Sequence, residues 1–327
     1  GLEPAVESLR ENLLSESHSV RVSTLKILSK YPKLDFITQI DNDKDDIDQQ
    51  LKGPCDIIEL LLRNELTPLD LNNERQRNML IDRIGAMVRS KYVPKVYTSL
   101  VMYSSLGMFF VKYSRVWPMI NNIFPILAKN DWDMFWTIIH RQLLKIRSKI
   151  TMTKKVDVLA VVDENEDEGE ESADEGEDAV MNTDKTKMKV YANKNKNEIE
   201  CLDDIINNHT DFVKYEELLF EALQTISSHI ERKCLLMFPM FEDFLENEYD
   251  KVKMRSKDST KKLILYLKLF ATFSKKTTAN KNQTVMLKMY NTYKRFLSNT
   301  NEEISLYALR CLFTYGQESL TACRSEL

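Results

Sequence analysis

Apolar residues recur every three or four positions along most of the chain. In the first such stretch the apolar stripe comprises Ala5, Val6, Leu9 and Leu13, and after the polar residues 15–19 the next comprises Val22, Leu25 and Leu28. A stripe with this period lies on one face of an α-helix. Two such stripes separated by a short polar turn predict a pair of antiparallel helices.

The same period continues over most of the remaining sequence. It predicts helices near 55–66, 74–91, 95–111, 114–128, 131–150, 201–208, 210–230, 232–249, 257–274, 281–298 and 301–315. Asp131 is placed to cap the helix that begins beside it. Pro125 is expected to kink or split its helix, because proline lacks the amide that the helix needs. Residues 41–50 form a polar connection between helices.

Two segments far apart in the chain resemble each other. Residues 20–28 (VRVSTLKIL) superpose on residues 304–312 (ISLYALRCL), with apolar residues at the first, third, sixth and ninth places and a basic residue at the seventh. Each copy follows a polar turn. This arrangement is similar to the second helix of a HEAT repeat, in which neighbouring helix pairs cover each other's apolar stripes.

The periodicity disappears between residues 151 and 200. Asp, Glu, Lys, Asn and Thr dominate there, and such a composition cannot bury enough apolar surface to offset the entropy of ordering. We therefore predict three parts. They are HEAT-like helical repeats over 1–150, a disordered insertion, first acidic and then Lys-rich, over 151–200, and HEAT-like repeats of the same solenoid over 201–327.

A closer resemblance covers roughly residues 55–150. Residues 106–118 (LGMFFVKYSRVWP) form a Leu-Gly helix followed by an aromatic-Ser-x-x-Trp turn, and residues 131–136 (DWDMFW) open an aromatic-rich helix. This order of parts is similar to the down-regulated-in-metastasis family, a very large HEAT-repeat component of the small-subunit processome. The resemblance implies a nucleolar scaffold that contacts ribosome-assembly proteins and pre-ribosomal RNA, and it carries over no catalytic residue.

Composition agrees with helices joined by short turns and separates two electrostatic regions. Only seven glycines occur in 327 residues, fewer than a β-sandwich or a loop-rich α/β enzyme ordinarily uses. The formal net charge is −4, but residues 163–178 hold 11 acidic side chains and no basic one. Without them the 46 basic residues outnumber the remaining 39 acidic ones, so the helical part is expected to be mildly basic.

Several classes of function lack their minimum residues. The five cysteines, Cys55, Cys201, Cys234, Cys311 and Cys323, form no CxxC pair, which argues against a zinc ribbon or a disulfide framework. No nucleotide-binding loop, zinc-hydrolase motif or nucleophile elbow occurs, and the acidic residues 163–169 miss the spacing of a calcium loop. No apolar run is long enough to cross a membrane. We expect no cofactor, no small-molecule substrate and no catalysis, and the ends of the sequence suggest a segment of a longer chain.

The densest group of cations lies around the start of the helix predicted at 257–274. It comprises Lys251, Lys253, Arg255, Lys257, Lys261 and Lys262. We predict that these residues lie in the turn between two helices. Cations on a turn can meet phosphates and give salt-dependent affinity for RNA. A solvated turn between repeats is the alternative interpretation. A weaker group comprises Lys145, Arg147, Lys149, Lys154 and Lys155.

The sequence thus favours an all-α, HEAT-type solenoid that serves as a non-catalytic scaffold in small-subunit ribosome assembly. A nuclear transport receptor or another α-solenoid adaptor is the alternative within the same architecture. An all-α enzyme would need titratable groups that converge on a pocket, and the sequence displays none.

Overall fold

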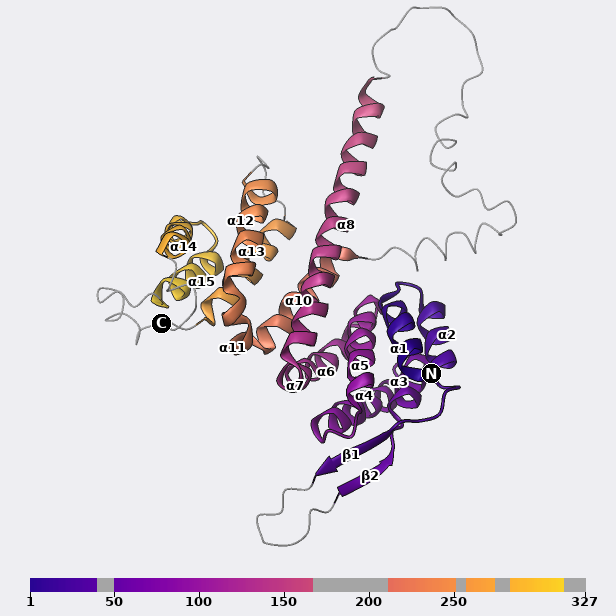
Figure 1. Ribbon diagram of the computed structural model, residues 1–327. Helices are drawn as coiled ribbons and strands as arrows, with labels where there is room; N and C mark the ends of the chain where they lie inside the picture. The colour runs from indigo at the N-terminus through magenta and orange to yellow at the C-terminus, as the bar shows by residue number, and fades with distance from the viewer. Residues whose placement is uncertain (40–49, 167–210, 251–256, 274–282, 315–327) are drawn as a thin grey trace, which may run out of the picture. The chain divides into compact units, whose positions relative to one another are not determined.

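The computed structural model describes residues 1–39, 50–166, 211–250, 257–273 and 283–314 (Figure 1). These residues are almost entirely helical, which confirms the all-α prediction. The chain divides into two compact units, one made of residues Gly1–Leu143 and Val213–Leu327 and the other of Leu144–Phe212. The predicted helix 201–208 and most of the predicted insertion lie outside the described residues.

The first helices of the larger unit form the predicted pair. Helix α1 (Leu2–Leu9) continues into the 3₁₀ turn η1 (Arg10–Leu14), and α2 (His18–Leu28) returns after a polar turn. Their core side chains include Val6, Leu13, Val22, Leu25 and Leu28. Helix α2 packs on α3 (Ile57–Leu66), and α3 packs on α4 (Glu74–Arg89) and α5 (Lys95–Gly107). Helices α2, α3 and α4 thus cover each other's apolar faces in chain order, as in a solenoid, whereas α5 packs mainly on η1.

A short β-hairpin, which the sequence analysis does not predict, has its strands on either side of the polar connection predicted at 41–50. Strands β1 (Asp35–Gln39) and β2 (Gln50–Pro54) pair in antiparallel register, with Asp35 opposite Pro54. The ring of Phe36 stacks on Tyr92 just beyond α4, with 4.7 Å between centroids. The hairpin escapes prediction because its strands are short and their alternation of polar and apolar residues is weak.

Proline divides the next helical stretch as predicted. After α5, the 3₁₀ turns η2 (Met108–Phe110) and η3 (Ser114–Val116) lead to the short helix α6 (Trp117–Asn121). Helix α7 (Phe124–Asn130) then begins anew with Pro125 in its first turn, where a missing amide costs nothing. Asp131 Oδ1 accepts a hydrogen bond of 3.0 Å from the Met134 amide, which confirms the predicted cap of the following helix.

Helix α8 (Trp132–Glu166) is longer than predicted. Its buried apolar stripe comprises Phe135, Trp136, Ile139, Leu143 and Ile146, whereas Trp132, which the periodicity places on the same stripe, is only partly buried. The helix continues beyond residue 150, so residues 151–166 are helical where the sequence predicts the start of a disordered insertion. In the smaller unit, the Lys149 ammonium lies 4.6 Å from the centre of the Phe212 ring.

The C-terminal helices surround an aromatic core. Helix α10 (Phe212–Thr225) is followed by α11 (Ser227–Ile230), the 3₁₀ turn η5 (Glu231–Lys233), α12 (Cys234–Phe244) and a π-helical turn, η6 (Leu245–Tyr249). Helices α13 (Lys257–Ala271), α14 (Gln283–Phe296) and α15 (Glu302–Phe313) complete the described chain. Tyr266 of α13 contacts the rings of Phe220, Phe241, Phe244 and Phe270. This enclosure explains why residues 263–273 are apolar nearly all round.

The two similar segments do not bury the same positions. Ile304 is 1% exposed, whereas Val20, its predicted counterpart, is 39% exposed. Cys311 is fully buried, whereas its counterpart Ile27 is 49% exposed. The two helices therefore turn different faces to their neighbours, and a shift of one residue, pairing Leu28 with Cys311, aligns their buried faces better.

Candidate partner surfaces and buried polar networks

The predicted basic cluster is only partly within the described residues. Lys251, Lys253 and Arg255 lie outside them. The structure places Lys257, Lys261 and Lys262 in the first turns of α13 and not in a connecting turn. Lys257 is exposed, and the exposed Lys261 ammonium lies 3.9 Å from Glu217 Oε1. These two side chains are available to a partner in solvent.

Lys262 has a different environment from its neighbours. Its side chain is only 10% exposed, and its ammonium lies 2.9 Å from Glu216 Oε2 and 3.0 Å from Glu248 Oε1. It also lies 5.0 Å from the centre of the Phe244 ring. A buried ammonium needs such partners, because removing it from water is costly. Lys262 therefore ties α10, the π-turn and α13 together, and we leave it out of any surface for RNA.

A polar hollow of about 390 Å³ lies at the end of the π-turn. Its walls comprise Tyr249, Asp250, Arg295, Phe296, Ser298, Asn299 and Thr300. Arg295 Nη1 donates to Asp250 Oδ2 over 3.0 Å, so the main charges of the hollow are paired. The sequence does not single out Arg295, because the hollow arises from the π-turn and from the turn before α15, which no local pattern brings together. Asp250 directly precedes the predicted basic residues 251–255.

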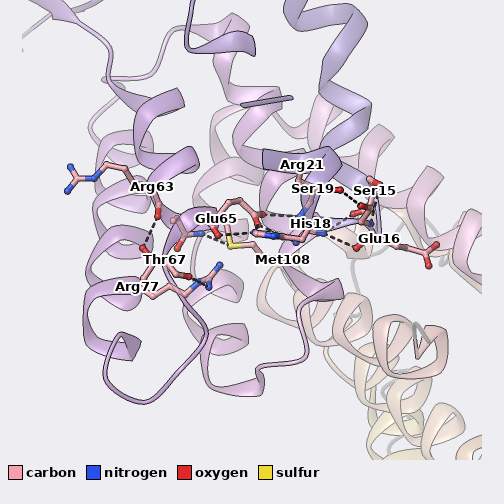
Figure 2. A network of polar contacts seen from close by, with 12 residues as sticks. Ser15, Glu16, His18, Ser19, Arg21, Arg63, Glu65, Thr67, Arg77 and Met108 are labelled. Carbon is pink, nitrogen blue, oxygen red and sulfur yellow. Dashed lines mark hydrogen bonds and ion pairs between the residues drawn. The ribbon is translucent and has the colours of Figure 1, made fainter. Parts of the chain in front are cut away.

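A buried charge network joins α2, α3 and α4 near the N-terminus (Figure 2). Arg21 of α2 donates to both carboxylate oxygens of Glu65, over 3.1 and 3.2 Å, and both side chains are almost fully buried. Arg21 also donates to the carbonyl oxygens of Ser15 and Glu16, which closes the polar turn before α2. The bidentate pair fixes the angle at which α2 meets α3.

The network holds more positive than negative charge. Arg77 of α4 is also buried, and its Nη1 donates to the Thr67 carbonyl oxygen over 2.9 Å. Burial lowers the pKa of the Arg77 guanidinium, while Glu65 raises it and Arg21 lowers it. The carboxylate of Glu65 thus serves two buried arginines. His18 Nε2 lies 3.0 Å from the Glu65 carbonyl oxygen and adds a further polar contact.

Two buried thiols and a buried tyrosine hydroxyl belong to the packed interior of the described helices. Burial raises the pKa of the Cys55 and Cys311 thiols, so both stay protonated and unreactive at neutral pH. Burial likewise raises the pKa of Tyr215, whose hydroxyl donates to the Leu106 carbonyl oxygen and accepts from Gln142. Among the residues that the structure describes, no group of His, Cys, Asp or Glu side chains is arranged to hold a metal ion. No described helix is both long and apolar enough to cross a membrane.

Short helices that bury their apolar faces against one another define the class: an all-α, helical-repeat protein. Residues 257–327, which include α13, α14 and α15, match the family described as U3 small nucleolar RNA-associated protein 20, N-terminal. The match supports a family of small-subunit processome components and a role in ribosome biogenesis and rRNA processing. It lies outside residues 55–150, so the finer resemblance to the down-regulated-in-metastasis family stays a prediction.

Proposed function

We propose that this chain is a segment of a non-catalytic, nucleolar scaffold that binds ribosome-assembly proteins and pre-ribosomal RNA during small-subunit assembly. The observation that carries the proposal is the family match over α13 to α15. The helical-repeat fold supports it, because such folds leave long helix faces free to hold other molecules. No observation favours the alternative of a nuclear transport receptor.

The assembly role is tested by sedimentation. We expect the tagged full-length protein to co-sediment with pre-ribosomal particles that contain the U3 small nucleolar RNA, and its depletion to raise the level of unprocessed small-subunit rRNA precursors. A protein that sediments free of those particles, and whose depletion leaves the precursors unchanged, would rule the proposal out. Binding to a nuclear GTPase only in its GTP form would instead support a transport receptor.

Direct contact with RNA is a separate part of the proposal. We assign it to Lys251, Lys253, Arg255, Lys257 and Lys261, of which the last two are exposed on the first turns of α13. The joint change of Lys251, Lys253, Arg255 and Lys257 to Glu should weaken RNA binding and flatten its dependence on salt, because each lost phosphate contact lowers the salt slope by about 0.7–0.9.

A matched control distinguishes this site from general charge. The control variant changes the exposed Lys26, Lys30, Lys129 and Lys294 to Glu, which reverses the same number of charges elsewhere. It should retain wild-type affinity and salt slope. If both variants lose affinity equally, the contact is diffuse and the basic cluster is not the site. Lys262 is left unchanged in both, because its loss would disturb the buried ion pairs with Glu216 and Glu248.

A further inference from the structure

The outer face of α4 combines positive charge with exposed apolar side chains. Leu71, just before the helix, is 68% exposed, and Met79 is 63% exposed. Both line an open hollow of about 430 Å³ together with Glu74, Arg75, Asn78 and Asp82. Leu66, the last residue of α3, and Leu69, in the turn that follows it, are also about half exposed. Large apolar side chains gathered at a hollow are typical of a docking surface for another molecule.

Three arginines extend from this hollow along the same helix face. Arg75, Arg83 and Arg89 are exposed, and within the described residues no ion pair or hydrogen bond engages their guanidinium groups. Residues 75 and 89 are separated by about 21 Å along the helix axis, from the rise of about 1.5 Å per residue. We call Leu71, Met79, Arg75, Arg83 and Arg89 the α4 surface. It presents apolar anchors at one end and a row of free cations along its length.

The acidic residues at the hollow only partly offset this charge. Glu74 accepts hydrogen bonds of 2.9 Å from the Tyr113 hydroxyl and from Arg115, and these donors lower the pKa of its carboxyl group. Its negative charge is therefore engaged by Arg115. The single negative charge of Asp82 then offsets only part of the positive charge of the three arginines. The α4 surface therefore complements an acidic occupant.

The hollow also contains a buried hydrogen-bond acceptor without a donor. Asn78 Oδ1 is shielded from solvent and has no hydrogen-bond partner among the described residues. Because protein atoms cover this oxygen, an occupant of the hollow would not reach it, and docking depends on the exposed side chains alone.

We infer that the α4 surface binds an acidic, amphipathic segment of a partner protein. Leucine-like side chains of that segment would enter the hollow between Leu71 and Met79, and its carboxylates would meet Arg75, Arg83 and Arg89. The chemistry favours protein over RNA here, because the anchors are aliphatic and RNA bases prefer aromatic or planar groups for stacking. The inference rests on the scaffold function proposed above.

The test uses two synthetic peptides of about 18 residues, a length that spans the α4 surface as a helix. One places Leu at every third or fourth position among Glu and Ala, and the other replaces each Leu by Ser. We expect the full chain to bind the Leu peptide in fluorescence anisotropy and to bind the Ser peptide at least about tenfold more weakly, since the apolar anchors are lost.

Variants locate the binding on the α4 surface. The triple variant R75E/R83E/R89E and the double variant L71S/M79S should each weaken binding of the Leu peptide by about tenfold or more. A control that reverses three exposed lysines elsewhere, K26E/K30E/K129E, should bind as the wild type does. All eight altered side chains are exposed, and unchanged melting temperatures would show that the variants fold.

Three outcomes would overturn the inference. Equal binding of the two peptides would show that no apolar anchor is used, and unchanged binding by both variants would place the site elsewhere. The chain could also bind a polyuridylate of roughly 20 nucleotides more tightly than the Leu peptide. If R75E/R83E/R89E loses that RNA binding and L71S/M79S keeps it, the α4 surface is an RNA surface. Each outcome concerns α4 alone, so co-sedimentation with pre-ribosomal particles could still succeed or fail independently.

Discussion

Gly107 allows helix α5 to approach the 3₁₀ turn η1 closely. A Cβ atom at this position would overlap the Leu13 carbonyl oxygen and would lie 3.0 Å from Arg21 Cδ. Gly85, on α4, is different, because its nearest neighbour would be Ile123 Cγ1 at an ordinary 3.6 Å. A side chain is therefore excluded at Gly107 and tolerated at Gly85. Only the tertiary structure distinguishes these two helical glycines.

We expect Gly107→Ala to lower the free energy of unfolding by about 1–3 kcal/mol or more, because the backbone oxygen of Leu13 cannot move aside cheaply. Gly85→Ala should be neutral or should stabilise by up to about 1 kcal/mol, since alanine favours the helix. Chemical denaturation of both variants measures the difference. Equal effects at the two positions would contradict the close approach of α5 to η1.

His140 lies in a row of stacked rings on α8 and supports a pH-dependent prediction. Its ring stacks on Trp136 with 5.0 Å between centroids. Burial lowers the pKa of His140 below its ordinary value of 6.5, and the nearby Lys233 ammonium lowers it further. As pH falls below the unfolded-state pKa, the unfolded chain takes up a proton that the folded chain resists, so stability decreases.

The change His140→Phe keeps a ring for stacking and removes the titration. Between pH of about 7.5 and 5.5, the wild type should therefore lose more stability than the variant does. Urea midpoints at several pH values measure the two slopes. Parallel curves for wild type and variant would show that His140 titrates alike in the folded and unfolded states.

Among the elements, the pairing of α2 with α3 depends most directly on a single carboxylate. Glu65→Gln would leave Arg21 and Arg77 buried without a negative partner, and we expect it to lower the free energy of unfolding by about 3–5 kcal/mol. Glu59→Gln is the control, because Glu59 is an exposed partner of Lys33 at 2.9 Å and should contribute less than about 1 kcal/mol. Similar losses for both variants in a denaturation experiment would refute the importance of the buried network.

Most elements could be predicted from periodicity, and the failures have local causes. Helices with one clean apolar stripe, such as α10, were predictable because burial of that stripe decides their position. The π-turn Leu245–Tyr249 was not, because it continues a helical pattern with different hydrogen bonds. The end of α8 was not predicted because residues 151–166 were grouped with the polar residues that follow, although residues 156–162 (VDVLAVV) are mostly apolar and can extend an existing helix.

The candidate site was less accessible to sequence reasoning than the fold. A run of cations in the sequence shows that positive charge is present but not which side chains face solvent. Lys261 and Lys262 therefore look equivalent in sequence. The structure exposes the first and buries the second between Glu216 and Glu248. Sequence alone likewise does not distinguish the exposed Arg75, Arg83 and Arg89 of α4 from Arg77, which is buried in the same helix.

Across the whole molecule, stability is expected to be regional, because α2 to α5 pack among the N-terminal elements, whereas α13 packs on α15 near the C-terminus. Glu65→Gln should therefore accelerate amide hydrogen exchange in α2, α3 and α4 and leave α13 and α15 protected as in the wild type. Hydrogen exchange measured by mass spectrometry resolves the two regions. A uniform increase along the chain would show a single cooperative unit and would contradict this picture.

The row of indole rings on α8 also bears on how unfolding can be observed. All three tryptophans, Trp117, Trp132 and Trp136, occur within one short stretch of the chain, whereas the rings around Tyr266 are phenylalanine and tyrosine. Indole emission therefore senses the loosening of α6 and α8 but not of α13, while far-ultraviolet circular dichroism senses every helix. A gap between the two melting curves would register region-by-region melting in a single cuvette, without labels or mutations.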